Sequence, residues 1–391
     1  MFAGIKVIEL ASVLAGPSVG QFFAELGADV IKVENFHAGG DVTRSWRLSG
    51  EETDDRSAYF SSVNWGKKSI AIDLSKPDGR AIIHQLIKMA DVVIASYKPG
   101  DAEKLEVDYQ TLSAINNCII YAQVTGYGAD NPRVGYDAVV QAEAGFMFMN
   151  GEPGGSSLKM PVALMDILAA HHLKEGILLA MLQRMQTGKG DLVEVSLIQA
   201  AITSLANQAS NWLVANRLPQ KQGSAHPNIA PYGDVFTTVD GREILLAIGS
   251  DRQFQDLCEL LHVPDLAKNP LFHTNSVRVK HRAELNDQLR NCFSKLDSTE
   301  ILPQLHQVKI PAGMIQNIKQ VFEMEEAKEL MFSADGLAGT RTIAFNSPSL
   351  NFSSHFLPPP HLGEHTLEIL QQNLGYGVET IQKLKEKHII P

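Results

Sequence analysis

The sequence predicts an α/β protein with a large, doubly wound (Rossmann-like) domain and a smaller α+β domain. Through residues 1–200, short β-rich runs alternate with helical runs, which is typical of a parallel sheet covered by helices. A stretch rich in Gly, Pro and His at 223–233 then interrupts regular structure, and a β-hairpin pattern follows it. The length of 391 residues also exceeds the usual size of one domain. We therefore expect two domains with separate cores.

The elements expected in the large domain alternate in order along the chain. Strands are expected at 6–10, 30–34, 69–74, 91–96, 118–125 and 192–197. Helices are expected at 18–26, 79–90, 102–115 and 168–185, followed by a long helix at 199–217.

Four parts of the chain follow from this pattern. They are a large α/β domain at 1–200, a linker at 201–225, a small α+β domain at 226–328 and a C-terminal part at 329–391. In the small domain, β-rich runs on either side of the turn pair Asp240-Gly241 predict a hairpin at 234–239 and 243–248. Short β-like runs from 337 and a final helix from 372 could rejoin the first domain or stand alone, and the pattern does not decide between these.

Composition and missing motifs exclude several function classes. A net charge of -10 argues against nucleic acid or an anionic membrane as the main partner. No apolar stretch reaches the length of a transmembrane helix. The sequence has no GxGxxG after a strand, no GxxxxGK[ST] and no HExxH, so nicotinamide, P-loop and zincin chemistry lack their usual motifs. We expect no metal site.

The cysteines and the first residues bear on the cellular compartment. The three cysteines, Cys118, Cys258 and Cys292, are far apart and form no CxxC, so a disulfide framework is not expected. Met1 leads almost at once into the strand expected at 6–10, which leaves no room for a signal peptide. We expect a cytoplasmic protein.

Asp166 is a lone carboxylate in the apolar run 160–170, and a helical pattern follows it. An Asp at the end of an extended run can cap a helix by accepting hydrogen bonds from the first helical amides. Alternatively, the helix dipole would hold the carboxylate ionised as a nucleophile that attacks an acyl group without a general base. Because caps are common, the local pattern alone favours the cap.

Loops next to the expected strands share a composition that suggests a ligand site. Open α/β sheets bind ligands at the carboxyl ends of their strands. Glycine lets the backbone approach a ligand, Lys and Arg meet phosphates, and Tyr can stack on a purine. Taken singly, each loop is ordinary surface composition, but together they suggest a nucleotide-like ligand; the segments are 39–44, 64–68, 96–100, 126–128 and 133–137. His226, in a loop constrained by Pro227 and Pro231, is a further candidate for lining a site.

Taken in order, these loops and the Asp166 segment resemble the class III CoA-transferases, the family that also contains the 2-methylacyl-CoA racemases. The resemblance covers nearly the whole chain and is greatest to transferases that use dicarboxylates, such as the succinyl-CoA:glutarate type. It runs through 13–17, 27–34, 39–41, 67–69, 98–100, 135–137, 166, 187–190, 225–227, 231–232, 249–254 and 358–366.

The resemblance implies that Asp166 is the catalytic aspartate. In this family the carboxylate attacks an acyl-CoA to give a mixed anhydride and CoA thiolate, and the thiolate returns to form an aspartyl-CoA thioester. An acceptor carboxylic acid then reverses the exchange. CoA and acyl-CoA are substrates, and no permanently bound cofactor is implied.

The resemblance also implies the residues that contact the substrates. The family's CoA contacts correspond to Val13, Lys67, Tyr97, Lys104 and Tyr136, with Arg44 a weaker candidate. His226 and Gly249 are candidate substrate contacts, the latter where the family has a glycine-rich lid. Leu14 replaces a Gln and Ser96 an Asn of the formyl-CoA branch, and the lid is reduced to Gly249-Ser250. These departures argue against formyl or oxalyl specificity.

The family architecture adds an assembly to the prediction. It implies a ring-shaped subunit whose large domain is built from both chain ends, with the small domain inserted between them, and two rings that interlock as a homodimer. The C-terminal part at 329–391 would then rejoin the large domain.

Two alternative functions remain open at this stage. A 2-methylacyl-CoA racemase needs two acid/base groups, and that branch has His-Asp where this chain has Tyr136-Asp137. A phenol is a poor base near neutral pH, which disfavours the racemase. A non-catalytic CoA-binding protein is the second alternative, and an Asp retained in an apolar frame at 166 speaks against it.

Overall fold

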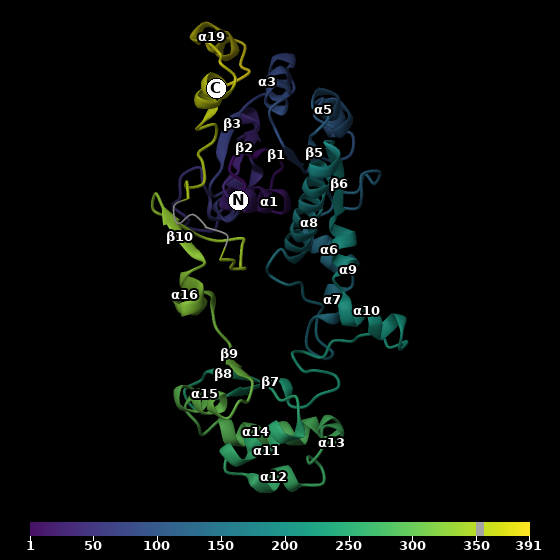
Figure 1. Cartoon of the computed structure of the whole chain (residues 1–391). Helices are drawn as coiled ribbons and strands as arrows, with labels where there is room; N and C mark the ends of the chain where they lie inside the picture. Colours follow the sequence, from purple (N-terminus) through teal and green to yellow (C-terminus); the bar gives the residue numbers. More distant parts are fainter. Residues whose placement is uncertain (349–355) are drawn as a thin grey trace. The chain divides into compact units, whose positions relative to one another are not determined.

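A computed structural model describes residues 1–348 and 356–391 of the chain (Figure 1). Residues 349–355, within the C-terminal part predicted at 329–391, lie outside the described residues. Two compact units account for the chain. Unit 1 comprises Met1–Ala144, Met160–Ser210 and Lys328–Pro391, and unit 2 comprises Gly145–Lys159 and Asn211–Ala327.

Unit 1 is built on a six-stranded sheet with the order β3-β2-β1-β4-β5-β6, in which all neighbouring strands are parallel. This is the strand order of the Rossmann fold, and it reverses direction between β1 and β4. The α/β prediction is confirmed. The strands are β1 Lys6–Leu10, β2 Asp29–Glu34, β3 Lys68–Ala71, β4 Val92–Ala95, β5 Ile120–Thr125 and β6 Asp191–Ser196, each within a few residues of its predicted range.

Helices cover the sheet of unit 1 and bury its central strands. Every residue of β4 is buried, which requires cover on both faces. Helix α8 lies along β5 and β6 and contacts α1 (Figure 1). The main helices are α1 Ala15–Glu25, α3 Pro77–Ile87, α5 Tyr109–Ile115 and α8 Leu164–Thr187.

Two helices predicted as continuous are broken in the structure. The run 102–115 divides into α4 Asp101–Lys104 and α5, because Glu106 has a positive φ and the Asp108 side chain caps α5 by accepting from the Thr111 N–H. The run 199–217 divides into α9 Leu197–Thr203 and α10 Ala206–Leu213, where Ala206 has a positive φ. Neither run contains a glycine or proline that would have predicted the break from the sequence.

The C-terminal segment of unit 1 contributes to the same core as the sheet. Ile369, Leu370 and Ile381 are buried in a cluster with Ile82 and Leu86 of α3. The final helix predicted from 372 is α19 Val378–Glu386. The smaller elements of unit 1 are η1 Phe36–Ala38, η2 Val42–Ser45, α2 Ala58–Ser61, α6 Asp137–Glu143, β10 Met331–Ala334, β11 Leu337–Thr340, α18 Thr366–Glu368 and η3 Ile369–Asn373.

Unit 2 contains an antiparallel sheet of order β7-β8-β9 with its own apolar core. The predicted hairpin is confirmed as β7 Tyr232–Thr237 and β8 Glu243–Ala247. The other elements, two of which (α10 above and α17) span the boundary between units, are α7 Phe146–Met149, α11 Asp251–Leu260, α12 Pro264–Lys268, α13 Asn275–Lys280, α14 Arg282–Phe293, α15 Ser298–Gln307, β9 Ala312–Met314, α16 Ile318–Glu323 and α17 Glu325–Lys328.

Candidate active site

A cavity of about 220 Å³ opens in unit 1 at the carboxyl ends of β1, β4 and β5. This is the edge where the strand order reverses and where open α/β sheets bind ligands. The lining comes from loops after the strands and from the first turns of α1, α6 and α8; its residues are Ser12, Val13, Leu14, Ala15, Ser96, Tyr97, Lys98, Pro99, Val124, Thr125, Gly126, Asn131, Arg133, Val134, Gly135, Tyr136, Asp137, Asp166 and Leu197.

Asp166 lines this cavity from the first turn of α8. The helix begins at Leu164 and its N-cap is Ala163, which has no side chain able to cap. The interpretation of Asp166 as the N-cap is therefore wrong, because the helix starts three residues earlier than an Asp166 cap requires. In the described part of the chain, no residue donates a hydrogen bond to this carboxylate, so it remains available to a ligand.

Burial, together with a smaller contribution from repulsion by the Asp137 carboxylate, raises the pKa of Asp166 to about 7. The sequence-based expectation was the opposite, that the helix dipole would keep this acid ionised. Desolvation outweighs the dipole here, because burial disfavours the charged carboxylate and the Asp137 charge adds repulsion. An acid that changes charge near neutral pH in a cavity is typical of a functional site.

Asp137 joins the beginnings of α6 and α8. Its Oδ1 accepts a hydrogen bond from the Met165 N–H at 2.8 Å, and its Oδ2 accepts one from Gln141 Nε2 at 2.7 Å. Gln141 in turn accepts from the Met160 N–H at 2.8 Å. Asp137 belongs to the motif at 135–137 but was not predicted as a site residue. An acid at the start of a helix, next to a predicted contact at Tyr136, was the signal that could have identified it.

Three of the predicted CoA contacts, Val13, Tyr97 and Tyr136, line the same cavity as Asp166. Val13 has a φ of 73°, which is rare for a β-branched residue. Burial raises the pKa of Tyr97 to about 12, so its hydroxyl stays neutral. Tyr136 is 58% exposed and offers an aromatic face to a ligand.

Two of the three predicted cations, Lys67 and Arg44, are buried and paired instead of facing the cavity. Lys67 Nζ lies 2.7 Å from Glu9 Oε2 and donates to the Pro17 carbonyl and Asn64 Oδ1, both at 2.8 Å. Burial lowers the pKa of Lys67 to about 8. A phosphate contact would require this buried ion pair to break. The contact of Lys67 with CoA stays a prediction, and it would require these partners to be displaced.

Arg44, like Lys67, is buried and forms ion pairs with carboxylates. Its NH2 lies 2.7 Å from Glu34 Oε2, its NH1 lies 3.2 Å from Asp55 Oδ2, and its guanidinium covers the Phe60 ring at 3.7 Å. All these partners belong to unit 1. A direct contact of Arg44 with CoA would likewise require its partners to be displaced.

Lys104, His226 and Gly249 are not among the residues that line the cavity. Lys104 is exposed on α4, with Nζ 3.1 Å from Asp101 Oδ1, and follows the cavity loop 96–99 by a few residues. His226 and Gly249 belong to unit 2. There the His226 N–H donates to the Tyr232 carbonyl, and the Gly249 N–H donates to Gln253 Oε1.

Lys98 and Arg133 are the two cationic side chains in the cavity lining. Both belong to the predicted ligand loops at 96–100 and 133–137, but neither was predicted as a site residue. Arg133 lies over the Tyr127 ring at 3.9 Å and pairs with Glu143, and these contacts hold its guanidinium in place. A polyanionic ligand in an acidic protein requires local positive charge, and these two side chains are the cationic groups in the lining.

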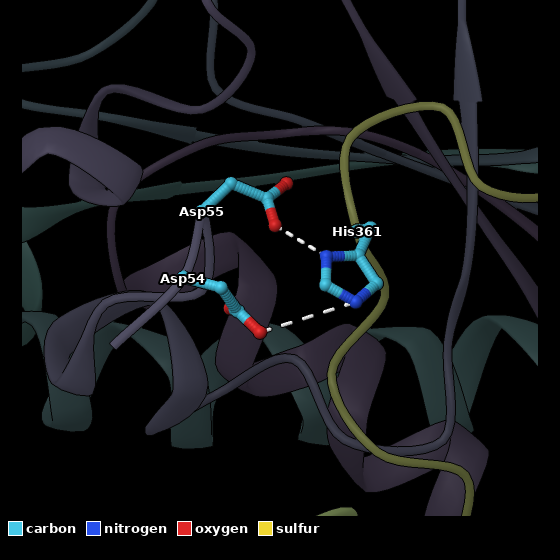
Figure 2. Close-up of side chains that lie close together, drawn as sticks. All are labelled: Asp54, Asp55 and His361. Atoms are coloured by element: carbon cyan, nitrogen blue, oxygen red, sulfur yellow. Dashed lines mark hydrogen bonds and ion pairs between the residues drawn. The ribbon is translucent and has the colours of Figure 1, made fainter. Parts of the chain in front are cut away.

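A cluster of Asp54, Asp55 and His361 is the place where described residues could converge on a cation (Figure 2). Figure 2 shows the His361 ring between the two carboxylates, with Nδ1 bonded to Asp55 and Nε2 4.0 Å from Asp54 Oδ2. Arg56 and Arg44 already neutralise these acids. The cluster instead links the C-terminal segment of unit 1 to its N-terminal segment Met1–Ala144, because the Leu362 N–H also donates to Asp55 Oδ2 at 2.7 Å.

Comparison with known proteins identifies the class of this chain. The family model described as CoA-transferase family III matches residues 2–366. The chain belongs to this family and is a CoA-transferase. No described helix is long and apolar enough to cross a membrane.

Individual relatives match over most of their length. A succinate–glutarate CoA-transferase of Agrobacterium fabrum is 37% identical over 97% of this chain and 96% of its own. A succinyl-CoA:glutarate CoA-transferase of Homo sapiens is 34% identical over 99% of this chain and 89% of its own. The crystal structure of a CAIB/BAIF family protein from Brucella suis is similar with a TM-score of 0.85 and 37% identity, covering 94% of this chain and 98% of that one.

Proposed function

We propose that this enzyme moves CoA from succinyl-CoA to a dicarboxylic acid, with Asp166 as the nucleophile. The observation that carries the proposal is the position of Asp166, a carboxylate with a pKa near 7 in the cavity at the strand reversal. The relatives named above for succinate, succinyl-CoA and glutarate support the choice of donor and acceptor.

The proposed reaction is a double exchange at one carboxylate. A carboxylate oxygen of Asp166 attacks the thioester carbonyl, the carbon–sulfur bond breaks, and CoA thiolate leaves a mixed anhydride. The thiolate then attacks the Asp166 carbonyl of the anhydride, which releases succinate and forms an aspartyl-CoA thioester. The acceptor carboxylate reverses both steps, so the new acyl-CoA leaves and the Asp166 carboxylate is restored.

This sequence consumes and releases no proton overall, so it needs an ionised nucleophile but no general base. The cavity lining suits that requirement, because it contains no histidine. For CoA we propose contacts at Val13, Tyr97 and Tyr136 and, at its phosphates, Lys104. His226 and Gly249 remain proposed substrate contacts from unit 2. Lys67 and Arg44 are assigned a supporting role, because both are buried in ion pairs.

The family resemblance further leads us to propose a ring-shaped subunit and an interlocked homodimer. Exposed apolar side chains support a partner surface, since patches of this kind usually need cover. They include Leu179, Leu182 and Met185 on α8 and Trp212 and Leu213 on α10. A cytoplasmic location is supported by the three free cysteines, which suit a reducing compartment.

The proposal is tested by offering the protein succinyl-CoA with a panel of carboxylic acids and identifying new CoA thioesters by mass spectrometry. Glutaryl-CoA or another dicarboxylyl-CoA should form, and monocarboxylates should react poorly. Trapping with hydroxylamine during turnover should convert Asp166 to a hydroxamate. No new thioester from any acid would refute the function, whereas thioesters made equally well by Asp166→Ala would refute the nucleophile.

A racemase would be revealed by a different isotope pattern. Racemisation removes the α-proton, whereas acyl transfer through an anhydride leaves it in place. A 2-methylacyl-CoA incubated with the enzyme in heavy water should therefore gain no deuterium at the α-carbon. Rapid uptake there would replace the proposed transferase with an isomerase.

A further inference from the structure

The loop 11–14 forms one wall of the cavity and contains a strained residue. Val13, Leu14 and Ser12 all line the cavity that contains Asp166. Val13 adopts a φ of 73°, in the left-handed region that β-branched residues avoid. Such a conformation costs about 1–3 kcal/mol and persists only where the surrounding structure enforces it. Something must therefore hold this loop.

Three consecutive residues of the loop are each held by a different element. Lys32 Nζ, on β2, donates to the Ala11 carbonyl at 2.9 Å. The Ser12 N–H donates to Ser96 Oγ, after β4, at 3.1 Å. The Val13 N–H donates to Asp41 Oδ1, the N-cap of η2, at 3.4 Å. These three anchors fix the turn of the chain at the point where it enters α1.

The anchors Lys32 and Asp41 belong to a buried ionic network that continues beneath the loop. Lys32 Nζ lies 2.8 Å from Asp41 Oδ2 and 3.0 Å from Glu9 Oε1. Glu9 Oε2 lies 2.7 Å from Lys67 Nζ, which also donates to the Pro17 carbonyl in the first turn of α1. The network thus holds the chain on both sides of Val13.

Burial and charge balance show that this network is built as a unit. Its four ionic side chains, Glu9, Lys32, Asp41 and Lys67, are all at most 4% exposed and comprise two cations and two carboxylates. Charge balance is what makes such burial tolerable. Helix α1 places Gly20 against it, where a Cβ would lie 1.8 Å from Glu9 Oε2. A buried ion cluster is often no more stabilising than apolar residues of similar volume, so a positional role is the better account of it.

We propose that Asp41 and Lys32 are positioning residues that hold Val13 in its left-handed conformation and so shape the cavity wall beside Asp166. This inference rests on the proposed function of the cavity. It also gives Lys67 a place in the enzyme: through Glu9 and Pro17 it supports the loop rather than the CoA phosphates. Release of the loop would let Val13 relax toward extended backbone and displace the wall, and a displacement of about 1 Å can cost about 100-fold in rate.

A double-mutant cycle tests whether Asp41 acts through the conformation of Val13. Glycine adopts positive φ without strain, so Val13→Gly removes the need for an enforcing anchor. We expect Asp41→Ala to lower kcat/KM for succinyl-CoA by about 10- to 100-fold when Val13 is present, and by less than about 3-fold in the Val13→Gly background. Asp41→Asn, which keeps an acceptor for the Val13 N–H, should restore part of the activity lost in Asp41→Ala.

A matched control separates positioning from general stability. Asp234, in unit 2, is also buried in an ion pair, with Arg282 at 2.9 Å, but it is far along the chain from the loop. Asp234→Ala should combine additively with Val13→Gly. If Asp41→Ala does not fold, Ser96→Ala, which removes the Ser12 anchor, takes its place in the cycle with the same expected rescue.

The outcomes distinguish this inference from the proposed function. A wild-type protein that transfers no CoA would overturn the function itself. An active wild type, in which Asp41→Ala and Ser96→Ala lose the same fold of activity with Val13 or with glycine at 13, would overturn the positioning role alone.

Discussion

Asp137 and Met165 are joined by a hydrogen bond of 2.8 Å from the Met165 N–H to Asp137 Oδ1, which places a second carboxylate beside Asp166. This contact fixes the first turn of α8 against α6. It also raises the pKa of Asp166, beyond the effect of burial, because two nearby carboxylates resist ionising together. One side chain therefore both fixes the helical turn that carries Asp166 and contributes to the raised pKa of Asp166.

Asp137→Asn should shift the pH dependence of transfer toward acid. Asp166 must be ionised to act as the proposed nucleophile, so kcat/KM of the wild type should rise with pH through about 7 and then level off. Asn keeps an oxygen for the Met165 N–H but removes the repelling charge, so its rise should occur at lower pH. Profiles from about pH 5 to about pH 9 measure this. An unchanged midpoint would show that burial alone controls Asp166.

Asp166→Asn should stabilise the fold at neutral and alkaline pH, even though it abolishes transfer. The folded-state pKa is raised from the model-peptide range to about 7, so the wild type loses stability as pH rises from about 4 to about 7. Each unit of pKa shift corresponds to roughly 1.4 kcal/mol. Asn carries no charge, so its advantage in the free energy of unfolding should grow over that range and stay constant above it. Denaturant unfolding at several pH values measures it, and a pH-independent difference would contradict the raised pKa.

Lys67→Met and Lys104→Ala should affect different properties: Lys67→Met the free energy of unfolding, and Lys104→Ala the KM for acyl-CoA. Lys67→Met leaves the buried Glu9 carboxylate without one of its cations, which should lower the free energy of unfolding by about 3–5 kcal/mol. Lys104→Ala removes an exposed charge and should leave that free energy unchanged within about 0.5 kcal/mol. If Lys104 meets CoA phosphates, its variant should raise KM for acyl-CoA but not for the acceptor acid, and the effect should shrink at high salt.

Two results of these assays would reverse the roles proposed for Lys67 and Lys104. Lys67→Met with unchanged stability and a raised KM for acyl-CoA would restore Lys67 as a direct CoA contact. An unaltered KM in Lys104→Ala would direct attention to Lys98 and Arg133, the cations of the cavity lining.

The fold could be predicted because local pattern and tertiary burial agree along most of the large domain. Strand β4 lies within one residue of its expected bounds at each end, since a parallel strand buried on both faces gives a continuous apolar run. The break before α5 could not be predicted in this way. Glu106 takes a positive φ so that the following Val107 can be fully buried, and that requirement exists only in the folded core.

The sequence was enough to single out Asp166, but not to predict the direction of its pKa shift. Asp166 stands out as a lone acid in an apolar run, and the cavity contains it. Its pKa direction depends on desolvation and on Asp137, which comes from another helix. Lys67 stands in a glycine-containing loop that resembles a phosphate site, but its partner Glu9 lies on β1, far earlier in the chain. Pairings of this kind become visible only when the strands are assembled.

Gly126→Ala should disrupt the cavity loop by separating two backbone segments that touch. A Cβ at Gly126 would lie 2.5 Å from the Gly135 Cα, and backbone cannot yield as a flexible side chain can. The loop between these glycines carries Arg133 and Val134 into the cavity lining. We expect Gly126→Ala to lower the free energy of unfolding by at least about 1–3 kcal/mol and to raise KM for acyl-CoA.

Gly128→Ala is the matched control in the same loop. Gly128 has a φ of 106° but no atom within 4 Å of an added Cβ, so its variant carries backbone strain without collision. It should cost about 1–2 kcal/mol and leave KM for acyl-CoA within about 2-fold of the wild type. Thermal unfolding and initial rates on both variants separate the two effects. Equal KM values for the two alanine variants would show that the contact between Gly126 and Gly135 does not position the cavity loop, and that strain alone governs this part of the chain.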